Sequence, residues 1–179
     1  VWTANGKEHT RPFTFTVIEA YPHEDSPFGL NHPAPTEGQL RLLSRAGIRW
    51  VRNWSVNWDW VEPEPGRFTW EAQDKQFAHM ASAKMNPLVV FPNPSARWAS
   101  TAPASVSDSM WYRLAYAPAD PELLYRFLGS AVERYRSACT HWEFLNEPLW
   151  VPDFCLPKKG GYTVPDYVKL LEGAYRAIK

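Results

Sequence analysis

Polar side chains follow four short apolar runs of the sequence, at the points where strands would end. They are Asn31, His32, Arg52, Asn53, Trp54, Asn93, Asn146 and Glu147. Neighbouring parallel strands present their carboxyl ends at one edge of a sheet, so a carboxylate, a guanidinium, amides and an imidazole would meet at one mouth. A single polar residue is expected wherever a loop begins, whereas four such strand ends favour a site. A carboxylate and an imidazole can exchange protons with a bound molecule, and guanidinium and amide groups can hydrogen-bond its polar groups.

Aromatic residues make up 15% of the chain, which contains 10 tryptophans. Aromatic rings with a polar handle suit sites where one face must be apolar and the edge wet. Sugars present such a surface, with C–H faces and hydroxyl rims. Because core packing accounts for most tryptophans in most proteins, this bias supports a sugar site only together with the polar mouth.

The elements that would position these residues alternate strand and helix four times. Strands are predicted over residues 28–30, 48–52, 87–91 and 142–146. The third of these is almost continuously apolar, which is typical of a parallel strand buried on both faces. Helices are predicted from a capping box at Thr36-x-x-Gln39 to Gly47, over 71–85, from Asp120-Pro121 to Tyr135, and from Thr163 onward. This order predicts an α/β fold.

Two α/β architectures fit this order: half of an eightfold (β/α)8 TIM barrel, or a small doubly wound sheet. The first strand is followed by Asn31-His32-Pro33 rather than a Gly-rich phosphate loop, and no G-x-S-x-G nucleophile elbow occurs, which disfavours the second. Residues 25–179 would form about the first four β/α units of a barrel. Residues 1–24 would form a β segment or the tail of an upstream β-domain, because Asn5-Gly6 is a turn signal and residues 13–18 alternate.

Charge and composition exclude several classes of protein. Lys plus Arg number 19 and Asp plus Glu number 19, so there is no basic excess for nucleic acid. No run of about 20 apolar residues predicts a membrane span. The histidines show no metal-ligand spacing, so no metal or other cofactor is expected. Cys139 and Cys155 would lie at opposite ends of the fourth strand, roughly 20 Å apart, so two free thiols are predicted.

The most informative motif is Trp142-Glu143-Phe144-Leu145-Asn146-Glu147-Pro148, in which a carboxylate follows an amide at the end of an apolar strand. It is accompanied by Gly47–Arg52 and by the spaced residues Trp58, Glu62, Pro63, Gly66, Phe68, Thr69, Trp70 and Asp74. On these motifs residues 28–179 resemble the clan A glycoside hydrolases, with the closest likeness to family 39 and its neighbours. The resemblance implies a (β/α)8 barrel that hydrolyses O-glycosyl bonds of an oligo- or polysaccharide with retention of configuration.

The resemblance also implies roles for individual residues. Glu147 would act as general acid and then as general base, and Asn146 would hydrogen-bond the sugar 2-hydroxyl. Arg52 would orient the nucleophile and keep it ionised. The remaining sugar-binding candidates are Asn31, His32, Trp54, Asn93, Trp98 and Trp150. The three tryptophans are candidates only because of their positions in loops. Glycosidic cleavage needs one carboxylic acid for the leaving oxygen and a second carboxylate for the anomeric carbon.

The chain departs from the family at that second carboxylate. The family places its nucleophile glutamate at the end of the seventh strand, and this chain stops after its fourth helix. Asp59, Glu62, Glu64 and Asp153 are predicted to be solvated loop charges, so none is assigned that role. We therefore expect the first half of a barrel, inactive alone, whose open sheet edges need the C-terminal half or another chain.

Two alternatives stay open beside this hydrolase fragment. One is a non-catalytic carbohydrate-binding protein, and the other is a structural half-barrel that pairs with a partner chain. For the hydrolase fragment and for the carbohydrate-binding protein, the expected ligand is a carbohydrate. Because glycans are usually degraded outside the cytoplasm, a secreted or periplasmic location is expected.

Overall fold

Four parallel strands form one sheet whose spatial order follows the chain. The computed structural model describes residues 1–12, 14–15, 17, 19–32, 36–109, 111–150 and 155–179. The sheet consists of β3 (Gly29–Asn31), β4 (Trp50–Asn53), β5 (Asn86–Phe91) and β6 (His141–Phe144). The predicted α/β order of four parallel strand–helix units is confirmed.

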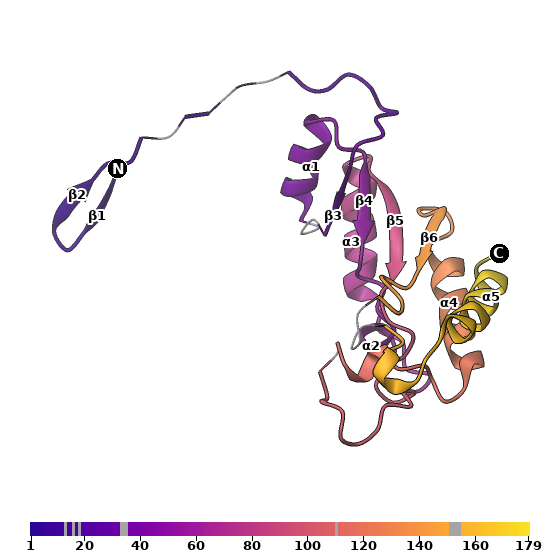
Figure 1. Cartoon of the computed structure of the whole chain (residues 1–179). Coiled ribbons are helices and arrows are strands. Elements are labelled where there is room, and N and C mark those ends of the chain that lie inside the picture. The colour runs from indigo at the N-terminus through magenta and orange to yellow at the C-terminus, as the bar shows by residue number, and fades with distance from the viewer. Residues whose placement is uncertain (13, 16, 18, 33–35, 110, 151–154) are drawn as a thin grey trace.

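A helix follows each strand and covers the sheet. The helices are α1 (Glu37–Arg45), α2 (Trp58–Val61), α3 (Glu71–Ser82), α4 (Pro121–Tyr135) and α5 (Val164–Ile178), with short 3-10 turns η1 (Arg113–Ala115) and η2 (Lys158–Gly160). Figure 1 shows α3 behind the middle of the sheet and α4 with α5 beside β6. The one-turn helix α2 was not predicted, because four residues carry too little periodicity to identify a helix.

The two faces of the sheet differ because side chains alternate along each strand. Register places Val90 of β5 beside Glu143 of β6, and Arg52 of β4 beside Leu88 of β5. These side chains therefore share one face, which we call the polar face. The opposite face carries buried apolar residues that pack against the helices: Val51, Val89, Phe91 and Phe144.

Aromatic rings fill the core between this apolar face and the helices. Trp58 stacks on Phe127 with ring centroids 5.7 Å apart, and Phe77 stacks on Tyr135 at 3.9 Å. Trp58 is only 1% exposed. At least part of the tryptophan excess therefore serves core packing rather than ligand binding.

Helix boundaries follow their local signals with one exception. Gly47 ends α1 with φ 88°, and the Asp120 carboxylate accepts the Glu122 N–H at 3.0 Å at the start of α4. Thr163 begins α5 with a capping box closed by Asp166. The predicted Thr36 capping box is wrong: Thr36 is the N-cap of α1, but its side chain makes no capping hydrogen bond. There the backbone alone starts the helical ladder.

Residues 1–24 contain a β-hairpin at the predicted turn, but not the strand predicted over residues 13–18. A hairpin of β1 (Trp2–Ala4) and β2 (Lys7–His9) turns at Asn5-Gly6, and Figure 1 shows it apart from the sheet. The strand predicted over residues 13–18 falls partly on positions 13, 16 and 18, outside the described residues. Its described positions 14, 15 and 17 belong to no strand.

The prediction of solvated loop charges is wrong for Glu62 and Asp59. Glu62 is 0% exposed, and its carboxylate accepts the Trp58 indole N–H at 2.7 Å and an Arg126 N–H at 2.9 Å. Asp59 accepts the Arg97 backbone N–H at 2.6 Å. Burial is sustained because each carboxylate has hydrogen-bond donors. Glu64 is exposed as predicted, and Asp153 lies outside the described residues.

The two cysteines are free, as predicted, and both are buried. The Cys139 thiol lies against the Pro87 carbonyl, and the Cys155 thiol donates to the Pro92 carbonyl at 2.9 Å. Burial raises the pKa of Cys139 to about 11 and the pKa of Cys155 to about 12. Both thiols therefore stay protonated at neutral pH.

Candidate active site

Arg52 connects three strands of the sheet through its guanidinium. Its Nε donates to Glu143 Oε2 at 2.8 Å, and its Nη2 donates to both Glu143 Oε1 and Asn146 Oδ1, the latter at 2.9 Å. Its Nη1 donates to Asn31 Oδ1 at 3.1 Å. Four of the five N–H groups of a guanidinium are thus used, and one N–H of Nη1 remains.

The sheet geometry explains why Arg52 reaches Glu143. Arg52 lies on β4 and Glu143 on β6, so the pair spans β5. Val90 of β5 is in register with Glu143 and is 0% exposed. Strands two apart are separated by about 10 Å, a distance that a long arginine side chain and a glutamate cover together. The ion pair raises the pKa of Arg52, chiefly through the hydrogen bond to Glu143 and with a further contribution from the Glu147 charge.

An aromatic wall stands beside this network. The Trp54 indole N–H donates to Asn31 Oδ1 at 3.2 Å, and its ring lies 4.3 Å from the His32 ring. The Arg52 guanidinium carbon lies 4.9 Å from the Trp54 ring centroid. Trp54 is therefore contacted by an amide and an imidazole, with a cation nearby.

These groups surround a hollow of about 340 Å³, which we call the polar hollow. It is lined by Asn31, His32, Arg52, Trp54, Trp111, Asn146 and Glu147. Six of the nine predicted site residues thus meet at the carboxyl ends of β3, β4 and β6.

Glu147 occupies a strained turn directly after β6. Leu145, Glu147 and Leu149 have φ values of 61°, 48° and 62°, a left-handed backbone that costs a non-glycine residue roughly 1–2 kcal/mol. The turn is fixed at both ends, because the Leu145 N–H donates to the Phe91 carbonyl at 3.1 Å and the Leu149 N–H donates to the Cys155 carbonyl at 3.0 Å. The Glu147 residue is exposed at the hollow.

Asn93 lies behind the strand ends rather than in the polar hollow. It is 3% exposed, accepts an amide N–H of Asn57 at 2.9 Å and donates to Cys155 Sγ at 3.9 Å. Asn93 therefore joins the loops that follow β4, β5 and β6.

Trp98 and Trp150 also lie outside the lining of the hollow. The Trp98 indole N–H donates to the Glu62 carbonyl at 2.8 Å, and its ring meets the Trp58 ring edge-on. Trp150 is 68% exposed. Loop position alone did not distinguish these tryptophans from Trp54.

Two residues of the site were missed from the sequence. Glu143 lies inside a strand, on the polar face of the sheet. A partly buried carboxylate there requires a counter-charge, and this requirement could have identified Glu143 together with Arg52. Trp111 comes from the long loop after β5, where no periodicity or spacing signalled it.

Arg113 gives that loop a fixed form beside Trp111. Its Nε pairs with Asp108 at 2.9 Å, and its Nη atoms donate to the Ala102 and Val106 carbonyls at 3.4 and 3.1 Å. The Arg113 side chain is 19% exposed. Hydrogen bonds from Arg113 to other residues of the loop therefore stabilise the segment that contains Trp111.

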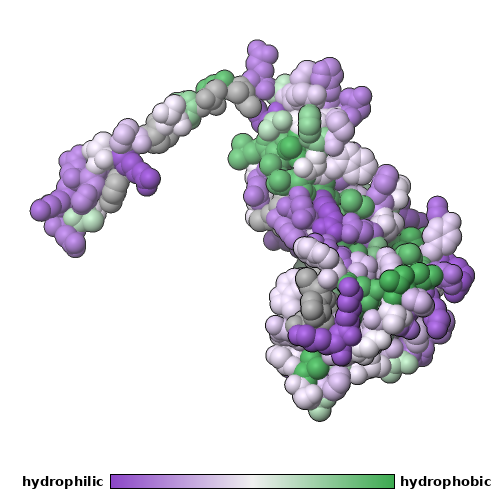
Figure 2. Space-filling view, in the orientation of Figure 1, coloured by the Kyte–Doolittle hydropathy of each residue, from purple (hydrophilic) through white to green (hydrophobic). Residues whose placement is uncertain are grey.

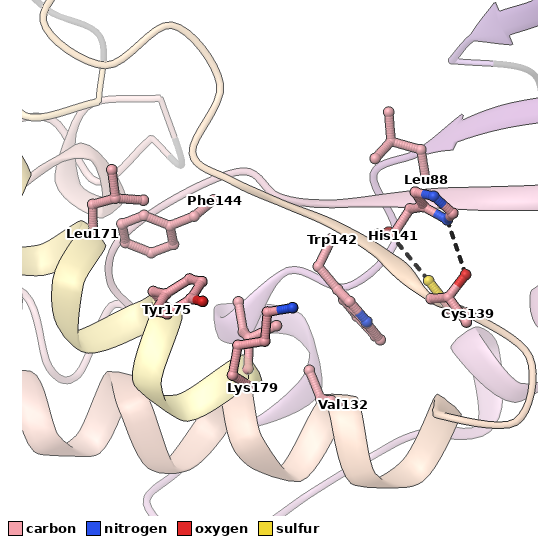
Figure 3. A pocket seen from close by; sticks show the side chains of 11 residues that line it. Leu88, Val132, Cys139, His141, Trp142, Phe144, Leu171, Tyr175 and Lys179 are labelled. Carbon is pink, nitrogen blue, oxygen red and sulfur yellow. Dashed lines mark hydrogen bonds between the residues drawn. The ribbon is translucent and has the colours of Figure 1, made fainter.

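A second, larger hollow of about 570 Å³ follows the outer edge of β6; we call it the apolar groove (Figure 3). Its lining is Leu88, Val132, Cys139, Thr140, His141, Trp142, Phe144, Leu171, Tyr175, Ile178 and Lys179. Figure 2 shows hydrophobic residues gathered at the surface near β6 and α5, and again near β3 and α1.

No described helix is both long and apolar enough to cross a membrane. Within the part of the chain that the structure describes, no three His, Cys, Asp or Glu side chains form a group that could hold a metal ion.

No protein-family model matches the chain. Among curated proteins, the chain is 26% identical over 128 residues to endo-1,4-beta-xylanase A of Fusarium oxysporum f. sp. lycopersici, covering 69% of this chain and 33% of the relative. It is 25% identical over 95 residues to endo-1,4-beta-xylanase 1 of Gibberella zeae, covering 53% of this chain and 25% of the relative. The chain therefore spans a third or less of the curated relatives it matches.

Solved structures give the same partial coverage. A family 39 glycoside hydrolase from Bacteroides cellulosilyticus superposes with TM-score 0.61 and 23% identity, over 87% of this chain and 30% of that chain. An exo-beta-1,4-mannosidase from an Opitutaceae bacterium gives TM-score 0.60 and 15% identity, over 85% and 29%. Endo-glycoceramidase II from Rhodococcus sp. gives TM-score 0.58 and 16% identity, over 84% and 45%. The likeness to clan A glycoside hydrolases is thus confirmed as a shared fold, in which this chain corresponds to part of a TIM barrel.

Proposed function

We propose that the chain is the first half of the catalytic barrel of a retaining glycoside hydrolase, with Glu147 as general acid and base. The observation that carries this proposal is the polar hollow. It gathers one carboxylate, two amides, a guanidinium, an imidazole and two indoles at the carboxyl ends of parallel strands, where barrel enzymes carry their chemistry.

Glu147 would protonate the glycosidic oxygen while a carboxylate nucleophile bonds to the anomeric carbon and the C–O bond to the leaving group breaks. In the second step Glu147 would take a proton from water, whose oxygen displaces the nucleophile. Asn146 would donate to the sugar 2-hydroxyl. Its Oδ1 already accepts from Arg52, so its Nδ2 donors are the free end of the amide.

The nucleophile would come from outside the described residues. A retaining pair needs carboxyl groups about 5–5.5 Å apart. Among the residues that line the polar hollow, Glu147 is the carboxylate, and the nearby Glu143 is bound to Arg52. The remaining N–H of Arg52 Nη1 is suited to orient an incoming carboxylate through a single hydrogen bond.

The C-terminal half of the barrel, or another chain, would cover the apolar groove. Burying side chains such as Trp142, Leu171 and Tyr175 would stabilise the assembly, because apolar area removed from water contributes about 25 cal/mol per Å². On this proposal the chain alone is inactive. A glycan-degrading enzyme of this kind would act outside the cytoplasm, as a secreted or periplasmic protein.

The substrate would be an O-glycosidic oligo- or polysaccharide, and the two xylanase-named relatives make β-1,4-linked xylotriose the first probe. Calorimetric titration of the chain with xylotriose, mannotriose and cellotriose tests the sugar site. We expect binding of at least one trisaccharide that Trp54→Ala weakens, while the matched Trp150→Ala leaves it unchanged. Equal losses in both variants, or binding to none, would contradict the proposal.

A non-catalytic sugar-binding protein is the alternative. Hydrolysis of aryl glycosides by the chain alone, and by the chain extended past Lys179 with its downstream sequence, separates the two. We expect turnover only in the extended protein, whereas sugar binding without turnover in both would favour the alternative.

A further inference from the structure

We infer that Glu143 is a positioning residue of this site: its carboxylate holds Arg52 so that Asn31 and Asn146 turn their amide N–H donors into the polar hollow. The inference rests on the proposed function and adds a residue to which neither the sequence motifs nor the comparisons assign a role.

The first step is the clamp on the guanidinium. Glu143 accepts from both Nε and Nη2 of Arg52, a two-point contact that fixes the plane of the group. The side chains are 22% and 33% exposed, so water competes less with this pair than with a surface pair. An arginine side chain has four rotatable bonds, and without the clamp it would sample many directions across the polar face.

The second step is the orientation of two amides. Asn146 Oδ1 accepts from Arg52 at 2.9 Å, and Asn31 Oδ1 accepts from Arg52 at 3.1 Å and from the Trp54 indole at 3.2 Å. With each carbonyl end engaged by donors, each NH2 end is left to point elsewhere, and both residues line the hollow. Hydroxyl oxygens of a sugar are acceptors that match these donors.

The third step concerns charge. Glu143 neutralises Arg52 within the network, so the guanidinium does not need Glu147 as its counter-ion. Removing the Glu143 charge would leave a half-buried cation whose nearest alternative partner at the hollow is Glu147. Arg52 would then form an ion pair with Glu147, the carboxylate that the proposed reaction requires. Its hydrogen bonds to Asn31 and Asn146 would be lost.

The test compares Glu143→Gln with Glu133→Gln in the 15N-labelled chain. Glu133 also pairs with an arginine, Arg136, but on the surface of α4 with both side chains about 70% exposed. We expect Glu143→Gln to shift the Asn31 and Asn146 side-chain amide signals and the Trp54 indole signal, and Glu133→Gln to leave them in place. Glu143→Asp, which keeps the charge, is expected to restore most of the wild-type positions.

Sugar affinity supplies the second readout. For the trisaccharide that the wild-type chain binds, we expect Glu143→Gln to raise Kd about tenfold or more, the usual effect of losing a charged hydrogen bond, and Glu143→Asp to recover most of it. If Glu143→Gln does not fold, Arg52→Lys replaces it, because lysine cannot serve three acceptors in one plane and should move the same three signals.

The outcomes separate this inference from the proposed function. A wild-type chain that binds no glycan defeats the proposed function, while the amide and indole signals still decide the role of Glu143. Signals that stay at their wild-type positions in folded Glu143→Gln, or that move equally in Glu133→Gln, overturn the inference.

Discussion

The two hollows of this chain lie on the same sheet and differ in almost every physical respect. The polar hollow is the smaller, at about 340 Å³, and is bounded by a hydrogen-bonded network of charged and amide groups at the strand ends. The apolar groove is larger, at about 570 Å³, and follows the side of β6 with tryptophan, phenylalanine and leucine. A choice by volume alone would select the apolar groove, although the convergent polar groups that chemistry requires line the polar hollow.

The comparison predicts its largest effect at Arg52. Arg52→Ala removes the donors that hold Asn31 and Asn146 and leaves the Glu143 carboxylate without its partner. We expect sugar affinity to fall by about tenfold to a hundredfold, measured by calorimetric titration. Arg67→Ala, which breaks an exposed pair with Glu64, is the control and should leave affinity unchanged. Equal losses in both variants would mean that the polar hollow is not the binding site.

A smaller effect is expected at Trp111. Its ring lines the polar hollow from the loop that Arg113 stabilises. Trp111→Ala should therefore remove one apolar surface of the hollow that would contact a bound sugar. An aromatic contact of this kind contributes about 0.5–1.5 kcal/mol, which corresponds to a rise in Kd of about twofold to tenfold. The same titration measures it. A variant that binds as tightly as wild type would remove Trp111 from the site.

A substitution in the apolar groove should change self-association of the chain without changing sugar affinity at the polar hollow. Leu171 lines the groove and is 37% exposed, so Leu171→Lys places a charge there at little cost in stability. Light scattering should show less self-association of the chain, with sugar affinity within about twofold of wild type. Val164→Lys, on the same helix but outside the lining, is the control. Loss of sugar binding in Leu171→Lys would mean that the two hollows act together.

The smallest contrast concerns the two thiols, one at each region. Cys139 lines the apolar groove with a pKa of about 11, whereas Cys155 lies behind the polar hollow with a pKa of about 12. At pH 8 both are protonated, and the thiolate fraction rises about tenfold for each pH unit below the pKa. Iodoacetamide should label both slowly, Cys139 before Cys155, at a rate that increases from pH 8 to pH 9. Faster labelling of Cys155 would contradict its burial against Pro92.

Features encoded by neighbours in the sequence were predicted well. Gly47, Asp120 and Thr163 mark helix ends through contacts a few residues away, and the apolar run into β5 identifies a buried parallel strand. The same locality explains why Arg52 and Glu147 line the polar hollow together, because both lie at strand ends and strand ends converge in this architecture.

Features that depend on distant partners were missed. Glu62 is buried because Arg126, 64 positions later, reaches its carboxylate. Glu143 joins the hydrogen-bonded network beside the polar hollow because of an arginine 91 positions earlier, on a strand two away in the sheet. Asn93 also ends a strand, yet it turns inward to Asn57 and Cys155. Strand register and loop packing determine where these three side chains lie, and neither can be predicted from neighbouring residues in the sequence.

The central claim is that Glu147 acts as the acid and base of a retaining reaction at the polar hollow. The most direct test is hydrolysis of aryl glycosides by the chain extended past Lys179, comparing wild type with Glu147→Ala in the absence and presence of azide. We predict a loss of about 10²–10⁴-fold on poor leaving groups, the usual contribution of a general acid. On activated substrates, whose leaving group departs without protonation, azide should restore turnover. It needs no base to attack the glycosyl-enzyme intermediate, displaces the nucleophile and yields a glycosyl azide of retained configuration. An active extended protein whose Glu147→Ala variant turns over at the wild-type rate, or gives no azide product, would contradict the account.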